Sequence, residues 1–277
     1  MTIDPVPNRL EEWLAAAGFP AREAQPLPGD VSLRRYTRLA AADGGSAVLA
    51  TYPPEIRATC SRFLRTGELL QQAGVPVPRV LDWSCDDGWM LLEDLGPETL
   101  GEWGRGRSWS ELAPFFQQAL DLADRIGRIP LEEVAGLSER LGRDLLLKEL
   151  AQTWDLFLQP RELTGNAALT GALRAALDQI CALLDAETPV ACHRDFMVRN
   201  LMRAGNGGGG GLVVLDHQDL RLGPPAYDLA SLLNDTLFPP AALEEAWLGA
   251  VLSAPADRVR YHRAAAQRTL KAIGTYT

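Results

Sequence analysis

The pattern of apolar residues changes near residue 94, and this change constrains the fold more than any other feature of the sequence. Before it, two pairs of short β-compatible runs flank turn sequences rich in Gly and Asp. These runs are residues 31–40, 46–52, 79–83 and 89–93. Residues 9–19 and 56–73 have the apolar spacing of helices. The first part of the chain is therefore predicted to be a small antiparallel sheet with one crossing helix, preceded by a short amphipathic helix.

From residue 110 onward the spacing becomes that of long helices, which we place at 111–128, 138–158 and 167–186. Two brief strands, 201–203 and 212–215, are joined by a glycine run that we read as a loop. Between the two patterns lies the short breaker sequence Asp-Leu-Gly-Pro, which we interpret as a hinge. A chain of 277 residues is long enough for two lobes. We predict an α+β, two-lobe fold with boundaries at 1–93, 94–97 and 98–277.

Composition and charge exclude several kinds of partner. No apolar run approaches the ~20 residues of a membrane-spanning helix, and the N-terminus lacks the basic and apolar segments of a signal peptide. A net charge of -9 argues against nucleic acid, whose affinity depends on Lys and Arg. The four scattered cysteines are expected to be reduced, structural thiols. We predict a cytoplasmic protein with neither a membrane nor a nucleic-acid partner.

One segment carries the chemistry. His193-Arg194-Asp195 is followed by Asn200, five positions after the Asp, and an aliphatic strand then ends at Asp216. Phosphoryl transfer needs a carboxylate that aligns the acceptor hydroxyl and oxygen ligands that hold a divalent metal. A hairpin of the two brief strands would bring Asp216 beside Asn200. Each piece has a plainer explanation on its own, because an isolated His-Arg-Asp is often a surface element and a lone Asp often caps a turn.

With these residues in place, the chain resembles the aminoglycoside phosphotransferase and choline-kinase superfamily. Within it, the chain is most similar to bacterial kinases that phosphorylate the anomeric hydroxyl of N-acetylmuramate and N-acetylglucosamine. The likeness rests on residues 29–36, 53–55, 91–96, 193–202, 216–219, 223–224, 227–233 and 266–271. It implies a protein-kinase-like fold that binds ATP and Mg2+ between its lobes.

The resemblance also implies roles for single residues. Adenine would lie against the hinge near Glu93 and Leu95, and the turn that contains Ser32 would cover the phosphates. Asp195 would be the catalytic base, and Asn200 and Asp216 would hold magnesium, with Asn200 thereby contacting the nucleotide. His193 is expected to support the loop, not to act as a base. Asp228 is expected to anchor this loop, although a charge at a helix N-terminus explains it equally well.

The chain departs from the kinase pattern at the strand 47–52, where most kinases of this fold have a lysine that binds phosphates. The only lysines here are Lys148 and Lys271. Our hypothesis is that Arg34 or Arg35 replaces that lysine, since a guanidinium binds phosphate with a fork of donors. The alternative is a pair of surface arginines on a strand. Glu68, the lysine's usual partner, is then expected to face solvent.

Two further departures concern the acceptor and the C-terminus. Met197 stands where the sugar kinases have a histidine, and a thioether donates no hydrogen bond, which leaves open an acceptor other than N-acetylmuramate. A predicted helix from about Pro255 is unfinished at Thr277, so we expect a shortened C-terminal lobe.

The function predicted from the sequence is ATP-dependent phosphoryl transfer to a hydroxyl of a small molecule, a sugar or amino sugar. The alternatives are an aminoglycoside or other small-alcohol phosphotransferase and a catalytically weak, nucleotide-binding pseudokinase. The oligomeric state is unknown from the sequence.

Overall fold

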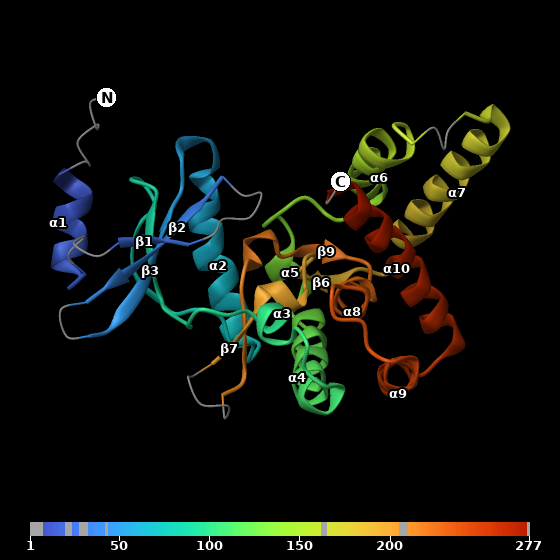
Figure 1. The fold of residues 1–277 in the computed structure, drawn as a ribbon. Coiled ribbons are helices and arrows are strands. Elements are labelled where there is room, and N and C mark those ends of the chain that lie inside the picture. The colour runs from blue at the N-terminus through green and yellow to red at the C-terminus, as the bar shows by residue number, and fades with distance from the viewer. Residues whose placement is uncertain are drawn as a thin grey trace.

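The computed structural model describes residues 8–19, 24–27, 33–41, 44–161, 165–204 and 210–275. Ser32, most of the turn expected to cover the phosphates, and most of the glycine run lie outside these residues. Figure 1 shows a sheet with two helices on one side of the molecule and a larger helical part on the other. This arrangement is the predicted α+β, two-lobe fold.

The smaller lobe is built on one antiparallel sheet with the strand order β1-β2-β3-β5-β4. Both predicted hairpins form, although β2 begins later than expected within the described residues. The strands are β1 (Ala24–Pro26), β2 (Arg35–Ala40), β3 (Ser46–Thr51), β4 (Val80–Ser84) and β5 (Trp89–Glu93). Strand β1, which the sequence analysis did not predict, pairs with β2 from Ala24 opposite Leu39 to Pro26 opposite Thr37.

The alternation of side chains along the strands gives the sheet two apolar faces. Leu49 on β3 and Leu91 on β5 bury one face together with Leu14 of α1 (Asn8–Ala16). Ala50 and Met90, each one residue away, bury the other face against α2. The predicted short helix therefore packs on the sheet, and the crossing helix lies on the opposite side.

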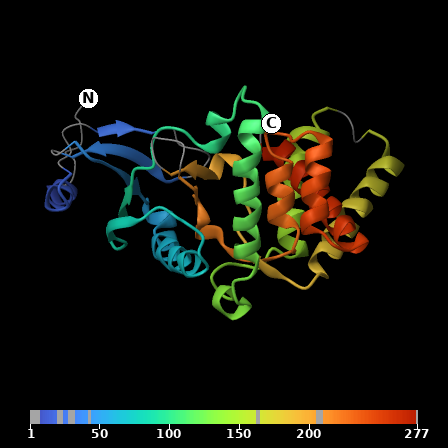
Figure 2. The ribbon, with the colours of Figure 1, turned by 90° about the horizontal axis from the view of Figure 1, so that it is seen from below.

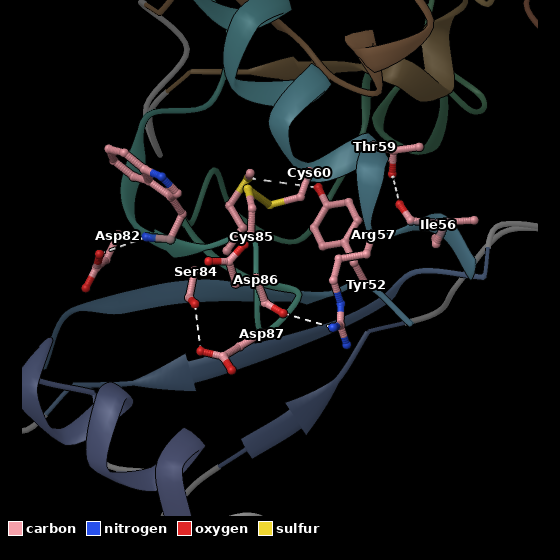
Figure 3. The surroundings of a disulfide bond; sticks show 12 residues. Tyr52, Ile56, Arg57, Thr59, Cys60, Asp82, Ser84, Cys85, Asp86 and Asp87 are labelled. Atoms are coloured by element: carbon pink, nitrogen blue, oxygen red, sulfur yellow. Dashed lines mark hydrogen bonds between the residues drawn. A yellow bond between two sulfur atoms is a disulfide. The ribbon is translucent and has the colours of Figure 1, made fainter. Parts of the chain in front are cut away.

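Helix α2 (Ala58–Gln72) is joined to the β4–β5 turn by a disulfide bond between Cys60 and Cys85, whose Cα atoms are 5.5 Å apart (Figure 3). The guanidinium of Arg57 donates to the carbonyl of Asp86 at 2.9 Å beside this bond. The prediction that all four cysteines are reduced is wrong for this pair, because pairing depends on tertiary proximity that a separation of 25 residues does not reveal. Cys181 and Cys192 are buried and reduced, as predicted.

The larger lobe consists mainly of helices. Its main helices are α4 (Trp109–Gly127), α6 (Arg143–Thr153), α7 (Ala167–Asp185), α8 (Tyr227–Leu233), α9 (Ala241–Val251) and α10 (Pro255–Thr275). Two four-residue helices, α3 (Leu100–Trp103) and α5 (Leu131–Val134), complete it, with a pair of strands β6 (Val190–Cys192) and β9 (Arg221–Gly223). The helix predicted at 138–158 is shorter, because it starts at Arg143 and continues after Thr153 only as the wider π turn Trp154–Leu158.

The predicted hairpin of brief strands is present as β7 (Leu201–Arg203) and β8 (Leu212–Val214). Leu201 pairs with Val214, so the residues just before β7 meet those just after β8. Val214 also donates to the carbonyl of Pro76, which follows α2. Figure 2 shows this hairpin at the junction between the sheet and the helices. The hairpin therefore places the end of the chemistry-bearing segment where the two lobes meet.

One described helix, α7, is long and apolar enough to cross a membrane by length and composition alone. A single such helix is weak evidence, and α7 carries Arg174 and Asp178 near its middle, where charge is costly in lipid. Arg174 stacks on the ring of Trp154, and Asp178 pairs with Arg143 at 2.5 Å. The expected absence of a membrane partner stays a prediction.

Candidate active site

The loop from His193 to Asn200 is fixed by the buried carboxylate of Asp228 at the start of α8. Asp228 accepts hydrogen bonds from the backbone amides of His193 at 2.6 Å and Arg194 at 2.9 Å. Because the carboxyl oxygens of Asp228 satisfy buried amides that would otherwise be costly, this contact determines where the loop begins. His193 in turn contacts the carbonyl oxygen of Leu215 through Nε2 at 2.8 Å. Asp228 and His193 therefore have the supporting positions expected from the sequence.

The described residues contain two non-glycine residues with positive φ, and both lie in this site. Arg194 has a φ of 79° and Asp216 has a φ of 57°. Such a conformation costs about 1 to 3 kcal/mol and persists only where surrounding contacts fix it. The side chain of Arg194 supplies such contacts, with Glu149 at 2.8 Å and Asp219 at 2.7 Å. The next residue, Asp195, lies at the edge of the same group of charges, with its Oδ2 4.0 Å from Arg194 Nε.

The carboxylate of Asp195 contacts two cations from the last helix. Its Oδ1 lies 3.2 Å from the guanidinium of Arg268 and 3.3 Å from the ammonium of Lys271, both on α10. Burial raises the pKa of Asp195, but the charges of Lys271, Arg268 and Arg194 outweigh it and hold the pKa below its usual range. Asp195 is therefore charged at neutral pH and can accept a hydrogen bond from a hydroxyl.

Asn200 and Asp216 come together as the hairpin geometry predicts. The amide of Leu215 donates to the carbonyl of Asn200 at 2.8 Å, which places Asp216 beside Asn200. The Asn200 Nδ2 donates to the carbonyl of Asp195 at 2.8 Å, so its oxygen is the atom left to act as a ligand. Both side chains line the same cleft.

A carboxylate and an amide oxygen fit a magnesium ion that takes its other ligands from phosphate and water. Among the described residues, no group of three His, Cys, Asp or Glu side chains forms a site that could hold a metal without a nucleotide. The donor set thus suits a metal that arrives with phosphates.

Arg34 and Arg35 differ in their surroundings. Arg34 is buried, pairs with Asp216, and donates to the side-chain oxygen of Gln218 at 2.9 Å. Arg35 is exposed and is not part of the cleft lining. Of the two arginines proposed to replace the missing lysine, the structure brings only Arg34 to Asp216.

A cleft of about 580 Å3 lies between the lobes, and its lining includes the predicted hinge as well as Asn200 and Asp216. Glu93 and Leu95 both line it. Glu93 is held by Arg79, which contacts its carboxylate through Nε at 2.8 Å. The backbone of Leu95 makes no hydrogen bond to another described residue, which leaves it available to a ligand. The residues expected to contact adenine and those expected to hold the metal therefore line one cleft.

Helix α2 reaches this site from the smaller lobe through His217. The hydroxyl of Thr66 lies 2.8 Å from His217 Nδ1, and the ring of Phe63 packs against the imidazole with the ring centres 4.2 Å apart. Burial lowers the pKa of His217 to about 3, so the ring is neutral. Glu68 on the same helix has a side chain that is 63% exposed, as predicted from the absent lysine.

Sequence reasoning missed the part that α10 plays in the site. Arg268 and Lys271 lie within residues 266–271, which contribute to the family resemblance but have no predicted role. Their spacing of three residues places them on one helix face, and Lys271 is one of two lysines in the chain. Glu149, which pairs with both Arg194 and Lys271, carried no sequence signal at all.

The fold, the cleft and the anchored loop define a small-molecule kinase with a protein-kinase-like fold. The sequence matches the phosphotransferase enzyme family, abbreviated APH, over residues 23–265. The chain belongs to this family.

Two bacterial kinases and one solved structure illustrate what the chain is similar to. The chain is 33% identical to an N-acetylmuramate/N-acetylglucosamine kinase of Pseudomonas aeruginosa, over 96% of this chain and 80% of that protein. A kinase of the same name from Pseudomonas putida is 30% identical, over 99% and 81%. The ADP-bound aminoglycoside phosphotransferase APH(2'')-Ib shares the fold, with a TM-score of 0.65 and 17% identity over 94% of this chain and 86% of that one.

Proposed function

We propose that this kinase transfers the γ-phosphate of ATP, with magnesium, to the anomeric hydroxyl of an N-acetylated amino sugar. The observation that carries the proposal is the side chain of Asn200. It lines the cleft beside Asp216 and at the same time binds the backbone of Asp195 at 2.8 Å. A metal–nucleotide complex in the cleft would thereby lie next to the carboxylate that receives the acceptor.

The cleft suits a purine nucleotide. Val48 from β3 lines it on the sheet side, and Met202 and Leu215 line it on the helical side. A planar, largely apolar ring fits between such walls, and the backbone of Leu95, which bonds to no other described residue, can hydrogen-bond its edge. The hinge that carries this backbone is fixed because Arg38 donates to the Asp94 carboxylate at 2.6 Å and to the Gly96 carbonyl at 2.7 Å.

Magnesium would neutralise the phosphate oxygens, and the protein's own groups would do the positioning. Asn200 and Asp216 would hold the metal. Arg34, which pairs with Asp216 in this structure, has a fork of donors that can contact a phosphate once a metal takes its place at the carboxylate. Ser32 and Arg35 stay predictions, as do the hinge and lobe boundaries at residues 93 and 97.

Asp195 would accept a hydrogen bond from the acceptor hydroxyl and orient its oxygen toward the γ-phosphorus. Little proton transfer is needed before the phosphoryl group moves, because the transition state is loose. A carboxylate whose pKa is held low is therefore adequate as an aligning group. The sugar class is proposed because relatives over nearly the whole chain are named as N-acetylmuramate/N-acetylglucosamine kinases. The cytoplasmic location stays a prediction.

The test is a panel of acceptors with Mg-ATP, comparing the wild type with Asp195→Asn. The panel contains N-acetylmuramate, N-acetylglucosamine, their 1-O-methyl glycosides, kanamycin and choline. We expect transfer to the free sugars, none to the glycosides, and a loss of at least ~100-fold in kcat for the variant.

The control is the affinity for Mg-ADP, measured by calorimetry, which Asp195→Asn should leave within about threefold because the carboxylate does not line the nucleotide cleft. Transfer to kanamycin but not to the sugars would show that the acceptor is an aminoglycoside, and the assignment as a kinase would stand. Nucleotide binding without transfer to any acceptor would favour the pseudokinase alternative. Equal rates for both proteins would remove Asp195 from the mechanism.

A further inference from the structure

The candidate base is held from one side by a helix that makes no contact with the nucleotide cleft. Arg268 and Lys271 on α10 both approach Oδ1 of Asp195, at 3.2 and 3.3 Å. Neither residue lines the cleft. The side chain of Arg268 is 5% exposed, whereas that of Asp195 is 24% exposed. The two cations of α10 therefore approach Oδ1 of the carboxylate, whereas the contact that Arg194 makes is with the other oxygen, Oδ2, at 4.0 Å.

Each of the two cations is itself held in place. Arg268 Nε donates to the hydroxyl of Ser231 on α8 at 3.0 Å. Lys271 Nζ lies 3.1 Å from a carboxylate oxygen of Glu149 on α6. Two buried donors with fixed second partners define the direction of the carboxylate much more tightly than a single contact at the surface does.

The attachment of α10 does not depend on these cations. Tyr261 and Ala264 of α10 are buried in the main apolar core. The hydroxyl of Thr153, at the end of α6, donates to the carbonyl of Leu270 at 2.5 Å. Gly274 lies so close to Thr153 that an added Cβ would overlap its backbone. The rotation and register of α10 are thus set by packing one turn beyond Lys271.

We propose that α10 is a positioning element for the phosphoryl acceptor: packing at Gly274 sets its register, and Arg268 and Lys271 then hold Oδ1 of Asp195 so that Oδ2 faces the acceptor hydroxyl. Arg268 and Lys271 are positioning residues, since they act through Asp195. The inference rests on the proposed function, in which Asp195 aligns the hydroxyl. It adds that the alignment of the hydroxyl depends on α10, a helix that begins 60 residues after Asp195.

The experiment measures kcat and the two Michaelis constants, with the best acceptor of the panel, for Lys271→Met, Lys271→Arg, Arg268→Lys and Gly274→Ala. We expect Lys271→Met to lower kcat at least ~10-fold with little change in KM for ATP, because a misplacement of about 1 Å can cost about 100-fold. Lys271→Arg should restore most of the rate. Gly274→Ala retains every charge but pushes α10 away from Thr153, so it should also lower kcat selectively.

Two matched controls accompany these variants. Lys148→Met removes the other lysine, which is exposed on α6, and Gly171→Ala adds a Cβ on α7 that meets no atom within 4 Å. Both should keep the wild-type kcat. Thermal unfolding and Mg-ADP binding give the folded fraction, by which every kcat is corrected.

A structural readout separates this inference from the proposed function. A crystal structure of the double variant Lys271→Met/Arg268→Lys should show Asp195 in a changed rotamer, whichever acceptor the enzyme uses. Loss of stability with an unchanged corrected kcat, or an Asp195 side chain that stays in place in that structure, would overturn the positioning role. If no sugar of the panel is phosphorylated but the Asp195 rotamer changes in the double variant, the proposed acceptor is rejected and the positioning role of α10 is retained.

Discussion

The two carboxylates of the site, Asp195 and Asp216, are both held by buried cations, but the cations come from different parts of the molecule. Arg268 and Lys271 reach Asp195 from α10, within the same helical lobe. Arg34 reaches Asp216 from the sheet lobe, just before β2. A contact within one lobe persists when the lobes move, whereas a contact between lobes can exchange.

This difference matches the tasks that we propose for the two residues. The aligning carboxylate must keep one geometry through every step, so contacts inside a packed lobe suit it. The metal ligand must exchange partners as Mg-ATP enters and leaves. An arginine that pairs with it in one state and contacts phosphate in another keeps the charge balanced in both.

The largest effect is expected for Asp216→Asn, which changes the carboxylate whose contact with Arg34 joins the two lobes. Removing the negative charge weakens the hold on magnesium, which supplies several kcal/mol of transition-state stabilisation. We expect kcat/KM for Mg-ATP to fall at least ~100-fold. Titrating activity against free magnesium should show that the variant needs a higher concentration. A normal magnesium dependence would mean that Asp216 is not a metal ligand and that the comparison between the two carboxylates fails.

The disulfide between Cys60 and Cys85 tests whether the sheet lobe helps to hold the residues around Asp216. It fixes the start of α2, whose Thr66 and Phe63 contact the residue after Asp216. Closing a loop of this length contributes about 3 kcal/mol to the free energy of unfolding in the chain-entropy view. We expect a thiol reductant to lower the urea midpoint of the wild type and leave that of Cys60→Ser/Cys85→Ser unchanged.

Thiol titration of the unfolded protein supplies the control for this prediction. Two reactive thiols before reduction and four after it would match the bonded pair and the two free cysteines. Four thiols before reduction, with no shift of the midpoint, would contradict the bond. Disulfides are rare in reducing compartments, so this measurement also bears on the predicted location.

The smallest effect that we expect is at Arg34. Arg34→Met removes the guanidinium that would contact phosphate, so KM for ATP should rise about tenfold, the size of one hydrogen bond to a charged group. Arg35→Met, on an exposed neighbour, is the matched control and should leave KM unchanged. An equal effect of both variants would show that general positive charge, and not the buried position of Arg34, attracts the nucleotide. No effect of either would refute the replacement of the missing lysine.

The pattern of apolar and turn residues predicted most of the secondary structure around the site. Period-two runs around Gly-containing turns indicated both hairpins of the sheet, and the spacing of Asp195 and Asn200 indicated the loop. These features are local, because turn residues and alternation act over a few positions. The helix predicted at 138–158 was less accurate, since a change to a π turn after Thr153 leaves no mark in apolar spacing.

By itself, the sequence determined the order of lobes, the hairpin that brings Asn200 beside Asp216, and the absence of a lysine from β3. Only the tertiary structure decided which cations contact the two carboxylates, which cysteines bond, and which helix supports Asp195. These partners lie 73 and 76 positions from Asp195 and 182 positions from Asp216. Over such separations, the partner of a side chain depends on how the helices and strands pack against one another. Composition and periodicity describe single elements and therefore do not indicate which elements pack together.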